Sequence, residues 1–173
     1  MKTEYLRSYD ILLYKGKGLT SRLIEWGSSS PYSHVAVVVE PEINLAIESN
    51  VGHQAGVRAL DLRKLKDGEV DTFRIKPEFP FNGKKVSSFL VGCLGAGYDY
   101  WGVTSLAFLK FAGWLTFKHY QGYNRFQMDK DYFCSELVFQ AFQEGGLDIV
   151  PQIGAADTTS PGDIARSPLI EKK

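Results

Sequence analysis

The chain has 173 residues, enough for one well-buried core but short for two, and its 44% hydrophobic and 23% charged residues are typical of a globular domain. Twenty Lys and Arg residues balance twenty Asp and Glu residues, so the basic excess that would favour nucleic acid as a partner is missing. Two cysteines without a CxxC pattern exclude a disulfide framework and indicate a reducing compartment, although a single Cys93–Cys134 bridge stays open.

The N-terminal half is predicted to form mostly β-strands. Residues 1–10 are charged and lack the apolar centre of a secretory signal, so we expect a cytoplasmic protein. A short helix is predicted over 23–26, where Gly27 ends it. Strands are predicted where β-branched and apolar residues gather, at 11–14, 34–39, 45–48, 57–60 and 70–75.

The C-terminal half is predicted to be helical. Asn82 is expected to cap a helix over 84–94, whose apolar stripe comprises Val86, Phe89, Leu90, Cys93 and Leu94. Residues 101–117 predict a second helix, which contains Lys110 and is shorter than the ~20 residues that span a bilayer. This helix is expected to be buried, or alternatively to rest on a membrane surface.

A third helix is predicted from about residue 132 to 144, capped by Asp129 or Asp131 and ended by two glycines at 145–146. Residues 160–163 predict a turn that leads into a short end piece. Because strands precede helices and no linker divides the sequence, we expect one α+β domain over residues 1–173.

Cys134 occupies a position suited to a nucleophile. On a helix, residues 134, 137, 138, 141 and 142 share one face, and the last four are Leu, Val, Ala and Phe. Cys134 therefore heads the core-facing stripe in the first turn, where unpaired N–H groups and the helix dipole lower a thiol pKa. The same N–H groups can stabilise an oxyanion. The alternative is a buried structural cysteine, which is the interpretation we favour for Cys93 in the last turn of its helix.

A catalytic cysteine needs a base, and the sequence offers three histidines. His34 opens the valine-rich strand, where an imidazole needs either a polar partner or contact with solvent at the strand end. His53 lies in a glycine-flanked stretch that predicts a loop, and His119 is expected at the surface. His34 is therefore the candidate base.

Glu48 is the candidate third residue, and the strand register decides whether it meets His34. If Glu40 faces Leu45 across a four-residue loop, the histidine and glutamate side chains point to opposite faces. If Val39 faces Leu45 across a five-residue loop, they lie diagonally on the same face, within reach of each other. The mechanism requires the second register; in the first, Glu48 is an exposed strand-end carboxylate.

Glu48 and three segments, at 33–38, 98–100 and 132–138, form a recognisable set. The set resembles the permuted papain-like branch of the NlpC/P60 superfamily, the bacterial YiiX/YaeF-like proteins, in which the histidine strand precedes the cysteine helix. The resemblance runs from Asp10 to Ile164, and its most specific part is the Cys-Ser-Glu-Leu-Val string after an aromatic pair. Tyr9 departs from the family, which usually has glycine there, and Ser49 replaces a commoner small residue.

The resemblance implies a circularly permuted papain-like fold, with an antiparallel sheet or small barrel packed against helices. Carried over by residue, it implies Cys134 as nucleophile, His34 as base and Glu48 as the orienting group. The implied activity is a cysteine peptidase or amidase that cleaves an amide bond of a cell-wall-type peptide or an acylated amino acid. No metal or cofactor is expected, because the histidines and carboxylates show no zinc spacing.

Two other functions stay open. The lecithin:retinol acyltransferase group shares the permuted layout, so a lipid acyltransferase or thioesterase is the first alternative. A non-catalytic ligand-binding module is the second, because a full set of residues is not itself an activity. The aromatic-rich segment 102–127 has no clear motif, so substrate specificity is expected to lie outside the recognisable part of the sequence.

Overall fold

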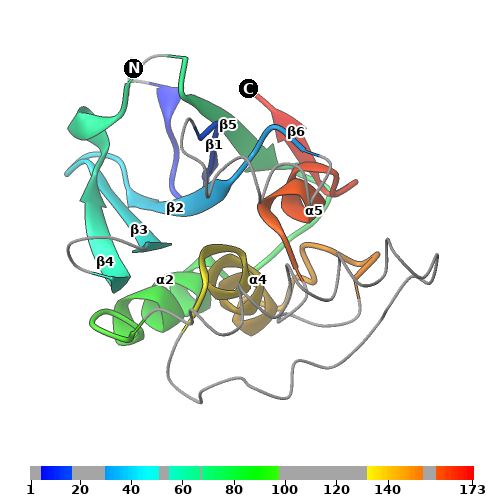
Figure 1. Ribbon diagram of the computed structural model, residues 1–173. Coiled ribbons are helices and arrows are strands. Elements are labelled where there is room, and N and C mark those ends of the chain that lie inside the picture. Colours follow the sequence, from blue (N-terminus) through cyan, green and yellow to red (C-terminus); the bar gives the residue numbers. More distant parts are fainter. Residues whose placement is uncertain (1–4, 17–29, 51–54, 67, 98–131, 154–158) are drawn as a thin grey trace, which may run out of the picture.

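The computed structural model describes residues 5–16, 30–50, 55–66, 68–97, 132–153 and 159–173. Within these residues, a six-stranded antiparallel sheet has the strand order β4-β3-β2-β1-β5-β6. Helices α2 and α4 lie side by side, and α4 packs on β2 and β3 (Figure 1). The strands are β1 (Ile11–Tyr14), β2 (His34–Glu40), β3 (Leu45–Asn50), β4 (Gly56–Asp61), β5 (Val70–Ile75) and β6 (Ile170–Lys172). The helices are α2 (Gly83–Gly92), α4 (Cys134–Glu144) and α5 (Pro161–Ala165), with a short 3-10 turn η2 (Leu62–Lys64).

This arrangement confirms the α+β class, and the five predicted strands occur close to their expected bounds. The predicted helices over 23–26 and 101–117 lie outside the described residues. Among the helices that the structure describes, none combines the length and the apolarity needed to cross a bilayer.

The valine run of β2 is explained by burial on both faces of the sheet. Val35 and Val37 pack into the main core, which the helices cover. Ala36 and Val38 pack into a smaller core on the other face, together with Leu62 of η2. A strand covered on both sides needs apolar residues at every position, so it reads as a continuous hydrophobic run. His34, at the start of this strand, is thereby held on a rigid element.

Helix α4 buries the stripe that the sequence predicted. Cys134, Leu137, Val138, Ala141 and Phe142 are all buried, and the helix ends at Glu144, with Gly145 as its C-cap and the next glycine at a φ of +85°. Its start differs from the prediction, because the first helical residue is Cys134 and the N-cap is the extended residue Phe133. The two aspartates that were expected as caps, at positions 129 and 131, lie outside the described residues.

Two predictions about where helices begin or end need correction. The 84–94 helix ends at Gly92 with Cys93 as its C-cap, so Leu94 leaves the apolar stripe and is 43% exposed. The predicted turn at 160–163 is instead the start of α5, where Ser160 and Asp163 form a capping box around a first-turn proline.

Candidate active site

A β-bulge in the β2–β3 hairpin sets the register on which the site depends. Glu40 faces Leu45, but the register shifts between Val38 and Glu40, so that Ala36 faces Glu48. A bulge adds one unpaired residue to a strand, so every residue before it changes partner. Both registers considered from the sequence therefore occur on one hairpin, the first at its tip and the second beyond the bulge.

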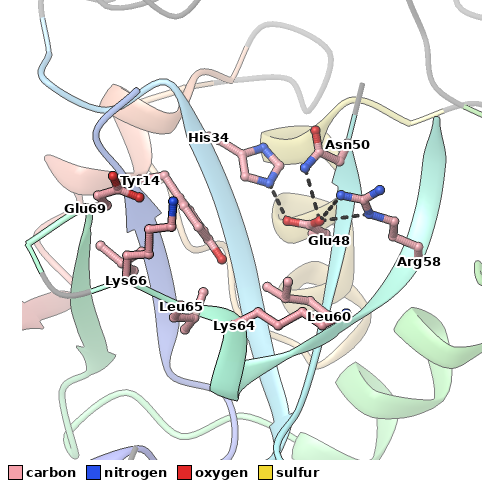
Figure 2. Close-up of a pocket in the computed structure, with 11 residues that line it drawn as sticks. Tyr14, His34, Glu48, Asn50, Arg58, Leu60, Lys64, Leu65, Lys66 and Glu69 are labelled. Atoms are coloured by element: carbon pink, nitrogen blue, oxygen red, sulfur yellow. Dashed lines mark hydrogen bonds and ion pairs between the residues drawn. The ribbon is translucent and has the colours of Figure 1, made fainter. Parts of the chain in front are cut away.

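The bulge brings His34 and Glu48 together on one face of the sheet. The Nε2 atom of His34 lies 2.8 Å from the Oε2 atom of Glu48 (Figure 2). Because an ionised carboxylate only accepts hydrogen bonds, Nε2 carries the proton and donates it. The other ring nitrogen, Nδ1, is then the one that remains for a further partner.

Glu48 is almost fully buried, at 2% exposure, and its second oxygen is also engaged. Oε1 accepts from Nδ2 of Asn50 at 3.1 Å and from Nε of Arg58 at 2.9 Å, and Nη2 of Arg58 forms an ion pair with the same oxygen at 2.8 Å. Burial alone raises the pKa of the Glu48 carboxyl, whereas the His34 hydrogen bond and charge, and then Asn50 and Arg58, lower it to about 2. The carboxylate is therefore ionised at every physiological pH.

Cys134 interacts with the same imidazole from the first turn of α4. Burial lowers the pKa of His34, whereas the hydrogen bond with Cys134 and the charge on its sulfur, followed by Glu48, raise the pKa to about 10. The structure thus brings together the three residues predicted from the sequence, and the imidazole interacts with both the thiol and the carboxylate. This is the arrangement that a nucleophile, a base and an orienting group require.

The backbone around Cys134 is attached to the rest of the fold by two serine hydroxyls. Ser49, the residue after Glu48, donates to the carbonyl oxygen of Tyr132 at 2.5 Å. Ser135 donates to the carbonyl oxygen of Thr159 at 2.6 Å. The first bond links the glutamate strand directly to the segment that leads into the cysteine helix.

Sequence reasoning missed three residues at this site. Asn50 and Arg58 contact Glu48, and the ring of Tyr14 packs against the imidazole of His34 with centroids 5.1 Å apart. A charged residue inside a predicted strand is weak evidence for a functional site, because alternate strand positions usually face solvent. The contribution of Arg58 to the site can be recognised only when its partner across the sheet is known.

A cavity of about 220 Å³ opens on the Glu48 side of the imidazole (Figure 2). Cys134 is not among the residues that line it. Its walls are Tyr14, His34, Glu48, Asn50, Arg58, Leu60, Lys64, Leu65, Lys66, Glu69 and Val70. Solutes can thus approach the carboxylate and its guanidinium partner from this side.

Of the remaining candidates from the sequence, Cys93 lies within the described residues. Cys93 is a free, half-buried thiol whose pKa is raised by burial, an effect that a hydrogen bond with Tyr132 partly offsets. His53 and His119 lie outside the described residues. In the part of the chain that the structure describes, no group of three or more His, Cys, Asp or Glu residues is placed to hold a metal ion.

Comparisons with known proteins reveal similarity in structure rather than in sequence. No family model matches the chain, and no curated protein matches it. Among solved structures, it is similar to the crystal structure of metalloprotein yiiX from Escherichia coli O157:H7, described as DUF1105. The TM-score is 0.63 and the identity 15%, over 96% of each chain. A similarity at this identity shows a yiiX-like fold.

Proposed function

We propose that the protein is a cysteine hydrolase of the permuted papain-like NlpC/P60 type, in which Cys134, His34 and Glu48 form the catalytic triad. One observation carries the proposal: a single imidazole is bonded to a buried carboxylate and also engaged by a thiol at a helix N-terminus. A histidine held in this way is oriented for proton exchange with the thiol. The yiiX-like fold over nearly the whole chain supports the same reading.

In the first step, the Cys134 thiolate attacks the carbonyl carbon of the substrate and forms a tetrahedral oxyanion. The first-turn N–H groups of α4 have no acceptor within the helix, and Phe133 at the N-cap has no side-chain oxygen to occupy them. These N–H groups are therefore the proposed donors to the oxyanion. The carbon–leaving-group bond then breaks, and the imidazolium of His34 gives its proton to the leaving group.

In the second step, the thioester on Cys134 is hydrolysed. Neutral His34 takes a proton from water, the resulting hydroxide attacks the thioester carbonyl, and the acid product leaves as the sulfur regains its negative charge. Glu48 remains ionised throughout and holds the proton on Nε2, so that Nδ1 exchanges protons with the reacting groups. Nothing is oxidised or reduced in either step.

The related fold raises the question of a metal, because the yiiX crystal structure is described as that of a metalloprotein. In the described residues, the donors around His34 do not form a metal-binding group, since Glu48 is already paired with the Arg58 guanidinium. The proposed steps use the side chains of this chain, and no step passes through a metal.

The proposed substrates carry an amide bond, in a cell-wall-type peptide or an acylated amino acid. Transfer of the acyl group to another nucleophile, as in a lipid acyltransferase or thioesterase, uses the same thioester. Incubation with muropeptides, N-acyl amino acids and fatty-acyl thioesters, followed by mass spectrometry of the protein, would identify the class that forms an acyl-enzyme.

The triad itself can be tested without a known substrate. Iodoacetamide near neutral pH should label Cys134 rapidly while Cys93 stays almost unlabelled, as measured by peptide mass spectrometry. In Cys134→Ala the rapid phase should vanish and the slow labelling of Cys93 should be unchanged. Equally slow labelling of both thiols in the wild type would refute the hydrolase and favour a non-catalytic ligand-binding module.

A further inference from the structure

The two oxygens of Glu48 have different kinds of partner, and only one of them faces the proposed chemistry. Oε2 accepts from His34, whereas Oε1 accepts from Nε of Arg58 and from Asn50 and also forms an ion pair with Nη2 of Arg58. Arg58 reaches Glu48 from the neighbouring strand β4, where the two residues are directly opposite each other. The guanidinium therefore holds the far side of the carboxylate from a fixed position in the sheet (Figure 2).

The charges of the site balance only when Arg58 is counted. A neutral thiol and neutral imidazole next to ionised Glu48 and protonated Arg58 sum to zero. A thiolate and an imidazolium with the same pair also sum to zero. Without Arg58 both states carry one uncompensated negative charge in a buried environment, where an unpaired charge is strongly unfavourable.

We propose that Arg58 is a positioning residue, which keeps Glu48 ionised and turned toward His34 as the pH falls. This role rests on the proposed function, since it acts on Cys134 through Glu48 and His34. If the guanidinium is removed, the buried carboxylate can regain neutrality only by taking up a proton. A protonated Glu48 no longer stabilises the positive charge of the His34 imidazolium. The Cys134 thiolate therefore loses its cationic partner at a higher pH than in the wild type.

Other groups near Glu48 do not substitute for this contact. Tyr14 of β1 faces the carboxylate, but burial raises the pKa of its phenol, so it stays neutral. Lys64, Lys66 and Glu69 line the same cavity, and none of them is among the hydrogen-bond or ion-pair partners of Glu48 within the described residues.

The geometry favours arginine over lysine at this position. Arg58 places two nitrogens of its planar guanidinium, Nε and Nη2, within 3 Å of one oxygen, which a lysine ammonium on a flexible stem does not reproduce. Arg58→Lys keeps the positive charge and loses the fixed fork, so the two variants separate charge from geometry.

The test follows the rate of Cys134 labelling by iodoacetamide as a function of pH. In Arg58→Ala the acid limb of the profile should move upward by about 1–3 pH units, the range typical of a carboxyl that loses an adjacent arginine. Arg58→Lys should recover part of this shift. Millimolar guanidinium, which can enter the cavity that Arg58 and Glu48 both line, should also recover part of it, whereas equal sodium chloride should not.

A matched control is Arg63→Ala, which removes an exposed arginine paired with Asp61 close to the end of the same strand. It should leave the profile unchanged. An unshifted profile in Arg58→Ala, or a shift that neither Arg58→Lys nor guanidinium reverses, would overturn the positioning role, because a change in packing alone is not reversed by a soluble cation.

A second measurement separates this inference from the proposed function. An NMR titration of the His34 imidazole reports the coupled carboxyl and imidazole without any need for thiol reactivity. If wild-type Cys134 is unreactive while Arg58→Ala still moves the His34 titration, the hydrolase fails and the role of Arg58 in holding Glu48 stands. If Cys134 is reactive and neither readout moves in Arg58→Ala, the inference fails and the hydrolase stands.

Discussion

The two cysteines lie on neighbouring helices of one core, and they differ in which helix end they occupy. Cys134 begins α4, whereas Cys93 caps the end of α2. Cys93 is half-buried and Cys134 is only 6% exposed, so accessibility alone would favour Cys93 over the proposed nucleophile. Cys134 has the imidazole of His34 beside it, while Cys93 has the phenol of Tyr132. The comparison shows that the neighbouring base and the helix end distinguish a candidate nucleophile from a core thiol.

The largest effect is expected when the imidazole that distinguishes Cys134 from Cys93 is removed. His34→Ala should slow iodoacetamide labelling of Cys134 about a hundredfold or more near neutral pH, because loss of a positioned base typically has this size. Labelling of Cys93 should not change. A Cys134 rate within twofold of the wild type would show that the histidine does not activate the thiol.

Glu48→Gln should produce the next largest effect. The variant keeps the shape but removes a charge-assisted hydrogen bond of about 1.5–3 kcal/mol, so Cys134 labelling should slow by roughly tenfold to a hundredfold. It also leaves Arg58 without its carboxylate, so urea denaturation should detect lower stability. Cys93 is again the internal reference, and a selective loss at Cys134 is the expected result.

The site should also make the free energy of unfolding decrease at both acid and alkaline pH. The pKa of Glu48 is lowered from 4.5 to about 2, so its contribution is present above pH 4.5 and is lost as the pH falls toward 2. The pKa of His34 is raised from 6.5 to about 10, so its contribution is present below pH 6.5 and is lost as the pH rises toward 10. Urea midpoints measured from pH 3 to 10 should fall at both ends.

Two variants check the origin of this pH dependence. Glu48→Gln should flatten the acid side, and His34→Gln should flatten the alkaline side. Unchanged pH dependence in both variants would mean that other groups are responsible.

The smallest effect is expected from Ser49→Ala. Loss of its hydrogen bond to the Tyr132 carbonyl should lower the free energy of unfolding by about 1 kcal/mol and slow Cys134 labelling only a few-fold. Ser87→Ala is a matched control, because that hydroxyl donates to the hydroxyl of Tyr9 rather than to the segment that leads into Cys134. Equal effects of the two variants on Cys134 labelling would argue against a specific role for Ser49.

The structure gives a physical reason for the departure at Tyr9, where the sequence pattern usually has glycine. Its φ of +72° lies in the left-handed region, which glycine adopts without strain. The tyrosine is retained here by packing, since its ring meets Phe81 edge to face and its hydroxyl accepts from Ser87. The resemblance pointed to the position, and the structure explains why glycine suits it.

Local sequence patterns were enough to predict the features that depend on a dozen neighbouring residues or fewer. The valine run predicted a buried strand, and the apolar spacing after Cys134 predicted the buried face of α4 with the thiol in its first turn. These signals are local, because strand and helix periodicity repeat within a few residues.

The contacts between distant residues of the site could be recognised only from the folded chain. The bulge next to Val38 selects the register that brings His34 to Glu48, and Arg58 reaches Glu48 through pairing with a third strand. The β6 strand joins the sheet edge at only three residues, too few to carry a pattern. Such contacts depend on packing between segments far apart in the chain, and no local periodicity encodes them.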